Sequence, residues 1–327
     1  MSMRKVLILI LLVASLSIGF IAPVSSAVAE TVKIGVQPWL GYGPWWIADQ
    51  QGFFTKHGLD VEVVNFTWDA DMSAAVASGR VQVIAAATNT LIAIRNQKID
   101  LQGFLVLDAS YEADAVLAPD SIKSIVDLKG KKVAYEAGAT SDLLINYALK
   151  VNNMSLKDIQ PVSMAASDAG LALIAGRVDV AVTYEPYISA ALRQGKGFHV
   201  LYTSAERPGL ISDLAVSERK YIEQNPETIK ALILAWDDAV RFLNDNPDEG
   251  GKIIADAVHS PMDEYRVAME GVHVYDLKEN QKIFGGEFQK AMIEISGIMK
   301  ETTPDVIKSI VDPGKALNIN YVKELAK

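Results

Sequence analysis

The chain has 327 residues, enough for two lobes of ordinary domain size, and its 50% hydrophobic and 22% charged residues are typical of a globular protein. A net charge of −9 argues against a nucleic-acid-binding protein, which needs basic patches to neutralise phosphate. The absence of cysteine excludes disulfides, thiolate catalysis and cysteine-based zinc sites.

The N-terminus has the pattern of a secretory signal peptide. Arg4 and Lys5 precede an apolar run, and Ala27 and Ala29 form an A-x-A cleavage pattern. The alternative is an uncleaved membrane anchor, because the apolar run is slightly long for a signal peptide. No later apolar run approaches the ~18 residues that span a bilayer. We therefore expect removal of residues 1–29 and a periplasmic or otherwise extracytoplasmic protein, with no stable membrane insertion after cleavage.

Short β-branched runs then alternate with helical stretches along the chain. The first series has strands at 31–36, 59–66 and 80–87 and helices at 44–51 and 72–78. The same order restarts with strands at 131–135, 159–164 and 177–184 and helices at 141–151 and 169–175. This βαβαβ order predicts an α/β protein whose mostly parallel sheets are covered by helices. Amphipathic helices are expected at 226–243, 247–258 and 287–299, with no clear strands between them.

Two segments of the chain resemble each other at the same point of the two series. They are ASGRVQVIAAATN at 77–89 and IAGRVDVAVTYE at 174–185, in which a helix ends at Gly and Arg-Val opens a buried strand. This similarity predicts two similarly built lobes.

The chain is expected to cross between the lobes twice, near 106–114 and 203–216. Lobe 1 would then be discontinuous, and the expected division is 30–112 with 216–327 for lobe 1 and 113–215 for lobe 2. Two crossings without a flexible linker indicate a hinge, which is suited to closure of the lobes around a ligand.

Ligands of open α/β sheets bind at the carboxyl ends of the strands, which defines the candidate segments here. The segments that follow the predicted strands are 37–46, 67–71, 88–90, 135–142 and 184–187, and we add the hinge segment 108–114 to them. They contain no Lys, Arg or His, and their acids are Asp69, Asp71, Asp108, Glu112, Asp114, Glu136, Asp142 and Glu185. A cleft lined by one sign of charge concentrates ligands of the opposite sign, so the sequence predicts a cationic ligand.

The loop PWLGYGPWWIA after the first strand is rich in aromatic residues. Trp39 and Tyr42 are expected to face the cleft, and Trp68 to add a second aromatic wall, because aromatic faces beside carboxylates hold organic cations. Trp39 could instead pack in the core, and Tyr42 could be a surface turn residue. Either Trp45 or Trp46 is expected to anchor the loop from behind.

Two carboxylates follow strongly apolar runs, where an unpaired charge is costly. Glu136 and Glu185 are therefore expected to bind the ligand, unless they pair with a structural arginine such as Arg177 or Arg193. Asp69 precedes a helix and has helix capping as its alternative role.

The remaining candidates for ligand contact are uncharged polar residues and the predicted helix start at 140–142. Thr88 and Asn89 supply neutral donors and acceptors. A bare helix start would attract an anion, but Asp142 in the first turn opposes one. The residues expected to contact the ligand are Trp39, Tyr42, Trp68, Asp69, Thr88, Asn89, Asp108, Asp114, Glu136, Ser141 and Glu185.

Patterns that would indicate catalysis or a bound cofactor are missing. The four histidines lack metal-like spacing, and there is no G-x-S-x-G, no Walker loop and no G-x-G-x-x-G after a strand. Nothing places a nucleophile or a metal beside the carboxylates. We therefore expect a protein that is not an enzyme and has no cofactor and no metal.

Four stretches resemble the extracytoplasmic substrate-binding proteins of nitrate/sulfonate/taurine-type ABC importers. They are VKIGVQPWLGYGPWWIADQQGFFTKHGLDVEVV, ASGRVQV followed by TNT, SIKSIVDLKGKKVAYEAGATSDLL and AGRVDVAVTYEPY. The resemblance implies a two-lobed type II periplasmic-binding-protein fold with the ligand cleft between the lobes. It also implies a monomer that delivers its solute to an ABC permease and its ATPase subunits. Members with runs similar to DADM and TYEPY are associated with guanidine-like compounds.

Several functions stay open at this point. The first is an importer subunit for a small nitrogen-rich, guanidine-like cation. The second keeps the role for taurine or another sulfonate or zwitterion, with the sulfonate at 139–141 and the ammonium on Glu185. A ligand-sensing module for a membrane receptor would use the same cleft. A pyrimidine-precursor synthase of the same fold is disfavoured, because such enzymes use a Cys-rich motif and this chain has none.

Overall fold

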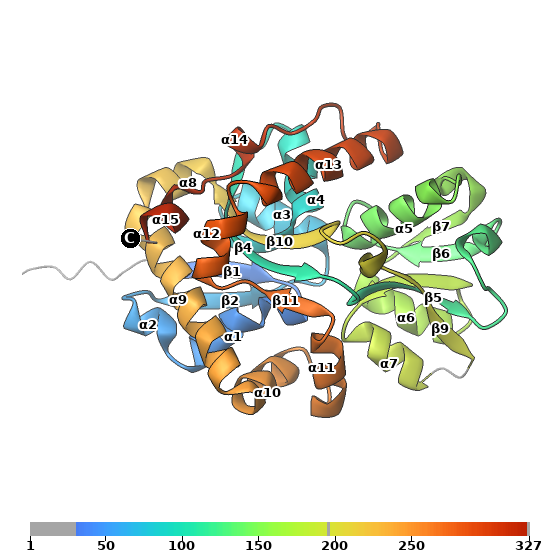
Figure 1. The fold of residues 1–327 in the computed structure, drawn as a ribbon, viewed down its shortest axis with the longest axis horizontal. Coiled ribbons are helices and arrows are strands. Elements are labelled where there is room, and N and C mark those ends of the chain that lie inside the picture. Colours follow the sequence, from blue (N-terminus) through green and yellow to red (C-terminus); the bar gives the residue numbers. More distant parts are fainter. Residues whose placement is uncertain (1–30, 195–196, 326–327) are drawn as a thin grey trace, which may run out of the picture. The chain divides into compact units, whose positions relative to one another are not determined.

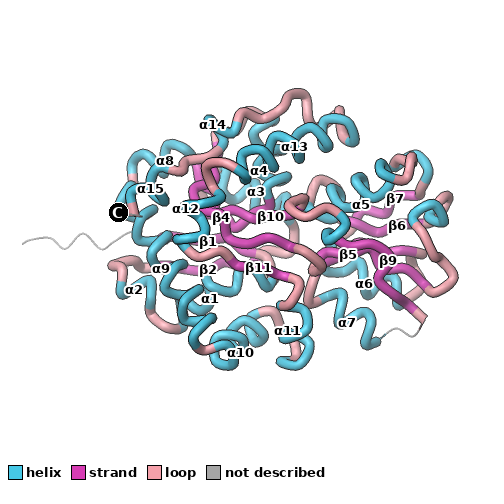
Figure 2. The backbone as a smooth tube through the Cα atoms, viewed as in Figure 1, coloured by secondary structure: helices cyan, strands magenta, loops and turns pink. Residues whose placement is uncertain are grey.

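The computed structural model describes residues 31–194 and 197–325, so the expected signal peptide and its cleavage site lie outside the described residues. Thr31–Lys327 form one compact unit, which contains two sheets flanked by helices (Figure 1). Figure 2 shows the strands of both sheets lying between layers of helices. Across the described ranges, no helix is both long and apolar enough to cross a membrane.

The first sheet has six strands in the order β11-β4-β10-β3-β1-β2. Their bounds are β1 Val32–Val36, β2 Val61–Asn65, β3 Val83–Ala87, β4 Leu101–Ser110, β10 Ile211–Glu218 and β11 Val272–Val274. Strand β1 pairs in parallel with β2 and β3, whereas β10 runs antiparallel to both β3 and β4. The carboxyl ends of β1, β2 and β3 therefore meet at one edge of the sheet, where the candidate site begins.

The second sheet has five strands in the order β7-β6-β8-β5-β9. Their bounds are β5 Asp114–Pro119, β6 Lys132–Tyr135, β7 Gln160–Ser163, β8 Val180–Tyr184 and β9 Phe198–Thr203. Strand β6 is parallel to β7 and β8, and β5 is antiparallel to β8 and β9. This order matches β2-β1-β3-β10-β4 of the first sheet, with β8 in the place of β3. Because the two similar segments end in β3 and β8, the prediction of two similarly built lobes is confirmed.

Helices cover both sheets. Those around the first sheet are α1 Gly43–Gln50, α2 Phe53–Lys56, α3 Asp69–Ala77, α4 Thr88–Asn96, α8 Arg219–Gln224, α9 Pro226–Asp245, α10 Pro247–Ala257, α11 Met262–Met269, α12 Leu277–Ile283, α13 Glu287–Thr302, α14 Pro313–Ala316 and α15 Asn320–Glu324. Those of the second sheet are α5 Thr140–Val151, α6 Ala166–Ile174 and α7 Tyr187–Gln194. Short 3-10 turns lie at Leu40–Tyr42, Ile125–Leu128, Leu156–Asp158 and Ser204–Glu206. Along the chain, 111–113 joins β4 to β5 and 204–210 joins β9 to β10, so both connections lie inside the expected crossings.

Three expectations about the elements are wrong. The helix expected at 72–78 begins at Asp69, so Asp69 lies in its first turn rather than before it. The sheets are mixed rather than mostly parallel, because the first has two parallel and three antiparallel strand pairs and the second has two of each. A short strand, β11, lies among the C-terminal helices, where none was expected. Alanine-rich α3 has little apolar periodicity, and three residues are too few to show an alternation.

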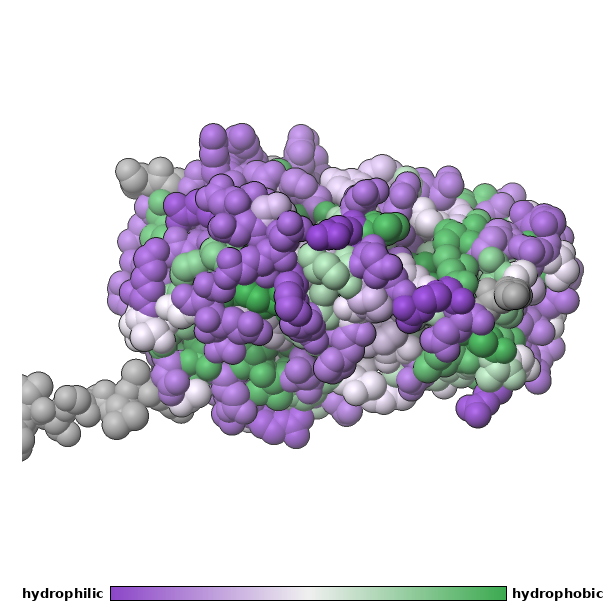
Figure 3. Space-filling view, turned by 90° about the horizontal axis from the view of Figure 1, so that it is seen from below, coloured by the Kyte–Doolittle hydropathy of each residue, from purple (hydrophilic) through white to green (hydrophobic). Residues whose placement is uncertain are grey.

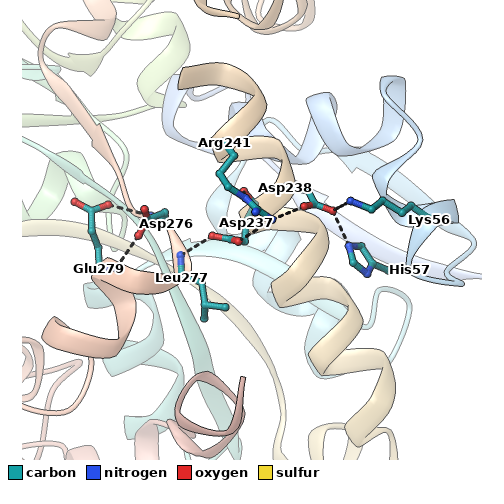
Figure 4. Close-up of polar contacts among 8 residues, drawn as sticks. All are labelled: Lys56, His57, Asp237, Asp238, Arg241, Asp276, Leu277 and Glu279. Atoms are coloured by element: carbon teal, nitrogen blue, oxygen red, sulfur yellow. Dashed lines mark hydrogen bonds and ion pairs between the residues drawn. The ribbon is translucent and has the colours of Figure 1, made fainter. Parts of the chain in front are cut away.

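Helix α9 connects α2 and α12 through two adjacent acids (Figure 4). Asp238 accepts hydrogen bonds from Lys56 Nζ at 2.6 Å and from His57 Nε2 at 2.8 Å, and it also pairs with Arg241. Asp237 accepts from the N–H of Leu277, the first residue of α12, at 2.9 Å. Burial raises the pKa of Asp238, but the Lys56 and His57 contacts outweigh it and the net pKa is lowered. These contacts fix α9, against which α1 packs.

The aromatic loop is anchored from behind by Trp45. Its ring is fully buried and lies 4.8 Å from Trp236 of α9 and 6.0 Å from Phe54 of α2, measured between centroids. The sequence left Trp45 and Trp46 as alternatives for this role, and both are buried. The ring contacts with Phe54 and Trp236 assign the anchoring role to Trp45, which leaves Trp39 and Tyr42 at the strand end.

The surface is mainly hydrophilic on the side of α10 and α11. Figure 3 shows this face with apolar side chains in separate areas rather than in one continuous patch. Scattered apolar side chains of this kind are normal on a protein surface.

Candidate functional site

A small cavity lies between the two lobes, at the carboxyl ends of the parallel strands. The volume of this cavity is about 40 Å³. It is lined by Gln37, Trp39, Tyr42, Asp69, Ala87, Asp114, Glu136, Ala139, Thr140, Ser141, Ala166, Tyr184, Ile211 and Asp213. This acidic cavity has four carboxyls in its wall and, among the described residues that line it, no Lys, Arg or His.

The aromatic wall of the acidic cavity comes from both lobes. Trp39 donates from Nε1 to Oδ1 of Asp108 at 3.0 Å, which fixes its ring. Its ring lies 5.9 Å from Tyr184 of the second lobe, edge to face at 83°. Tyr42 is buried and hydrogen-bonded to the carboxyl of Asp213. The indole and the two phenols can therefore present ring faces and edges to a cation held by the acids.

Residue 41 is a glycine because the backbone of the loop lies very close to the side chains of Trp39 and Asp108. A Cβ at position 41 would overlap both the carboxyl of Asp108 and Nε1 of Trp39. Both groups are buried and bonded to each other, so neither can move away at low cost. The glycine therefore lets the loop backbone pack directly against the Trp39–Asp108 pair.

We expect Gly41→Ala to destabilise the protein by roughly 1–3 kcal/mol, the usual cost of overpacking a tight site. Chemical unfolding measures this change. Gly285→Ala is the matched control, because a Cβ there meets no atom closer than 3.7 Å. Equal stability of the two variants would show that the Trp39–Asp108 pair is not tightly packed against residue 41.

Five carboxyls form what we call the acidic cluster: Asp69, Asp108, Asp114, Glu136 and Asp213. Burial is the main cause of a raised pKa for every member. It raises the pKa of Asp69 to about 6, of Asp114 and Glu136 to about 7, and of Asp108 to about 8. The pKa of Asp213 is also raised, by burial and then by the charges of Asp108 and Asp114.

Asp108 and Asp213 form the centre of the acidic cluster. They occupy paired positions on the antiparallel strands β4 and β10. Asp108 is fully buried and Asp213 is 5% exposed. Oδ2 of Asp108 and Oδ1 of Asp213 are buried and receive no hydrogen bond from an N–H or hydroxyl donor among the described residues, although the two carboxyls are hydrogen-bonded to each other. An ionised carboxyl oxygen in this position is costly, and a cationic donor in the cavity would satisfy Asp213, which lines it.

Glu136 joins the two lobes. Its Oε1 accepts from the N–H of Asp69, the first residue of α3, at 2.7 Å. Its Oε2 accepts from the N–H of Ala166, the first residue of α6, at 3.3 Å. A carboxylate is favoured at a helix N-terminus, and Glu136 serves one helix of each lobe. Its buried side chain therefore favours the closed arrangement of the lobes.

We expect Glu136→Ala to shift the ligand-free protein towards an open arrangement and Glu136→Gln to shift it less, because the amide keeps one acceptor. Of the two hydrogen bonds, the one to Asp69 crosses between the lobes, and the loss of a charge-assisted hydrogen bond costs about 1.5–3 kcal/mol. Small-angle X-ray scattering should show a larger radius of gyration for the alanine variant. Glu223→Ala, an exposed change on α8, should leave it unaltered. Identical scattering from all variants would contradict a closing role for Glu136.

The start of α5 lies in the same wall. The N-cap, Ala139, supplies no side-chain cap to the helix. Ser141 turns its Oγ to the N–H of Glu136 at 2.9 Å, and Asp142 accepts from the N–H of Gly138 at 2.8 Å. Asp142 thus binds backbone next to the helix start, where its charge disfavours an anion.

The structure brings six of the eleven sequence-predicted ligand contacts into the acidic cavity. They are Trp39, Tyr42, Asp69, Asp114, Glu136 and Ser141. Asp108 lies directly behind Trp39 and belongs to the acidic cluster without lining the cavity. The role of each residue in binding remains a prediction.

The other four predicted contacts lie outside the cavity wall. Trp68 is 37% exposed at the start of α3. Thr88 donates to the backbone carbonyl of Ser212 at 2.9 Å, and Asn89 lines a neighbouring groove. Glu185 accepts from the N–H and Oγ of Ser189, at 3.0 and 2.9 Å. The alternative of an Arg193 partner for Glu185 does not apply, since Arg193 pairs with Glu264.

Sequence reasoning missed Asp213 and Tyr184 as individual site residues. Asp213 interrupts the apolar strand ISDLAV, and a buried acid in such a run is the signal that could have identified it. Tyr184 falls in a candidate segment, and its hydroxyl is buried without a partner among the described residues.

The described part of the chain contains no group of three His, Cys, Asp or Glu side chains arranged to hold a metal.

Comparison with known proteins identifies a matching family and several binding proteins among the relatives. The family model described as NMT1/THI5 like matches residues 41–250. The taurine-binding periplasmic protein of Escherichia coli K12 is 25% identical over 230 residues, which cover 67% of this chain and 69% of that protein.

Solved structures show the same fold. The periplasmic aliphatic sulphonate binding protein SsuA from Escherichia coli has a TM-score of 0.72 at 22% identity, covering 88% of this chain and 91% of that one. SsuA from Xanthomonas axonopodis pv. citri, bound to MOPS, has a TM-score of 0.76 at 18% identity, covering 88% and 98%. The predicted two-lobed periplasmic-binding-protein fold is confirmed.

Proposed function

The chain belongs to the NMT1/THI5-like family, and from this premise we propose that it is the solute-binding subunit of an ABC importer, with a small organic cation as its ligand. One observation carries the choice of ligand. Four carboxyls line the cavity between the lobes, and no cationic side chain is among the described residues that line it. A site of one charge sign concentrates ligands of the opposite sign.

A planar guanidinium-like group fits the chemistry of the acidic cavity. Guanidinium donors pair with carboxylates in bidentate fashion and stack on aromatic faces. The carboxyls of the cavity wall, Asp69, Asp114, Glu136 and Asp213, supply the first kind of contact, and the rings of Trp39, Tyr42 and Tyr184 supply the second. Closure of the lobes removes water and strengthens the charge interaction.

Surface ion pairs support the closed arrangement on two sides. Arg193 of α7 pairs with Glu264 of α11, and Lys150 of α5 pairs with Glu301 of α13. Each pair joins a helix of the second sheet to a helix beside the first. Because both pairs are partly exposed, each contributes at most about 1 kcal/mol. The closed lobes would form the surface that the periplasmic protein, acting as a monomer, presents to its permease and ATPase partners.

A taurine-like zwitterion is the second candidate. The relatives named for taurine and aliphatic sulphonate binding favour a sulfonate. The start of α5 lines the acidic cavity without a side-chain cap on its first N–H groups. These donors could bind a sulfonate while the carboxyls bind the ammonium. A simple anion without a cationic group would meet only repulsion from the acidic cluster.

Thermal denaturation with guanidine, methylguanidine, choline, taurine and nitrate tests the choice, because a ligand that binds only the folded state raises the Tm. We expect the guanidines to raise the Tm and nitrate to leave it unchanged. A rise with taurine and with no guanidine would establish the zwitterion instead. A rise with nitrate or a simple alkanesulfonate alone would refute the cation proposal.

A further inference from the structure

A larger groove adjoins the acidic cavity and has no part in the function proposed so far. Its volume is about 780 Å³, within the ~300–1,000 Å³ typical of small-molecule sites. It lies among α3, α4, α5 and the C-terminal end of α13, which packs on both α4 and α5. Asp69 and Ala139 line both the groove and the acidic cavity, so the two spaces share a wall. We call this space the side groove.

One wall of the side groove is a helix face made of small residues. Ala70, Ala74 and Ala77 of α3 line it at positions i, i+4 and i+7, which share one side of a helix. A face with this spacing usually packs its side chains against a neighbour. Here the three methyl groups leave the space open, and Leu143 of α5 and Met299 of α13 line other parts of the groove. The walls are therefore largely apolar.

Asn89 provides a second, independent sign of an occupant. It is 2% exposed, it lines the side groove, and its Nδ2 has no hydrogen-bond partner among the described residues. A buried amide donor without a partner costs about 1–3 kcal/mol. An acceptor atom of a molecule in the groove would remove this cost.

The acidic cavity and the side groove differ greatly in volume, so each suits a different part of a ligand. At about 40 Å³, the acidic cavity has room for a headgroup of a few heavy atoms and little more. The side groove is far larger, and the described residues that line it include no Lys, Arg or His to attract a second anion. Asp69 and Ala139 separate the two spaces, so a tail that extends from the cavity into the side groove would pass between these two residues.

We propose that the ligand is an amphipathic cation, with its charged head in the acidic cavity and an uncharged aliphatic tail in the side groove. This inference rests on the proposed function and names its substrate class. The tail buries apolar surface against α3 and α5, which is favourable by the hydrophobic effect. The head supplies charge recognition, and the tail supplies most of the discrimination among cations.

Titration calorimetry with guanidinium, n-butylguanidinium and n-hexylguanidinium tests the inference on the mature protein. Each methylene buried in the side groove is expected to tighten binding about fourfold. The hexyl compound should therefore bind at least ~100-fold more tightly than guanidinium.

Ala74→Leu should remove most of that gain, because leucine fills the side groove, and should change guanidinium binding less than about threefold. Ala74 is exposed to the groove, so the variant can fold. Ala77→Leu serves as a second groove variant. Ala175→Leu is the matched control, because Ala175 is exposed at the end of α6 and lines neither space.

The outcomes separate this inference from the function on which it rests. Equal affinity for guanidinium and its alkyl derivatives would overturn the side groove as a tail site and leave the cation proposal standing. An affinity gain that survives in both Ala74→Leu and Ala77→Leu would place the tail elsewhere and would also overturn it. Failure of every cation to bind would overturn the proposed function together with this inference.

Discussion

Asp213→Asn is expected to weaken binding of a guanidinium ligand by roughly 30- to 150-fold. Asp213 is buried in the wall of the acidic cavity, and its Oδ1 receives no hydrogen bond from an N–H or hydroxyl donor among the described residues. The loss of a charge-assisted hydrogen bond in such a site costs about 2–3 kcal/mol, and each 1.4 kcal/mol is tenfold in affinity. Titration calorimetry at pH 8 measures the change.

The same substitution is expected to make the ligand-free protein more stable at pH 8. Asparagine has nearly the same shape as aspartate and removes a buried charge that faces Asp108. Opposite effects on binding and stability distinguish a ligand-binding carboxyl from a structural one. Asp71→Asn is the matched control, since Asp71 is exposed on α3 and should change neither quantity. Unchanged affinity in Asp213→Asn would contradict the assignment of Asp213 to the site.

The ligand-free protein is expected to lose stability as the pH rises from 5 to 8. The acidic cluster has pKa values of about 6 to 8 when folded, caused chiefly by burial, against about 4 when unfolded. In this window the folded state holds more protons than the unfolded state, so the free energy of unfolding falls with pH. We expect a fall on the order of a few kcal/mol, measured by urea unfolding across the pH range.

A bound cation reverses this trend, because it stabilises the ionised carboxyls. The rise in Tm caused by guanidinium should therefore be larger at pH 8 than at pH 5. Asp108→Asn should flatten the pH dependence of the ligand-free protein, since it removes the member whose pKa is raised to about 8. Ligand-free stability that rises between pH 5 and 8 would mean that the cluster is not buried as the structure has it.

Local patterns predicted the fold where each element has a strong signal of its own. TVKIGV, KKVAY and RVDVAVTY alternate or run apolar over the length of a strand, and the structure has β1, β6 and β8 there. Helix α3 begins three residues earlier than expected. The run DADM is compatible both with a cap before the helix and with the first turn of the helix. The three residues of β11 form a strand only by pairing with the end of β4, which is tertiary information.

The sequence predicted some residues of the candidate site and missed others. The rule that ligands bind at strand ends placed Trp39, Asp69 and Glu136 correctly in the wall of the acidic cavity. It missed Asp213, because that residue comes from an antiparallel strand, β10, whose amino end rather than its carboxyl end reaches the cavity. Local sequence also could not show that Glu136 binds the starts of two helices in different lobes, since those contacts span 30 and 67 residues.

The central claim is that the acidic cavity binds a cation through ionised carboxyls. Titration calorimetry of guanidinium at pH 7, in two buffers that differ in ionisation enthalpy, tests it most directly, because the difference in heat counts the protons released. The account predicts saturable binding with net proton release, since the raised pKa values of the acidic cluster fall when a cation binds. Binding of nitrate or an alkanesulfonate with proton uptake, and no binding of guanidinium, would contradict it.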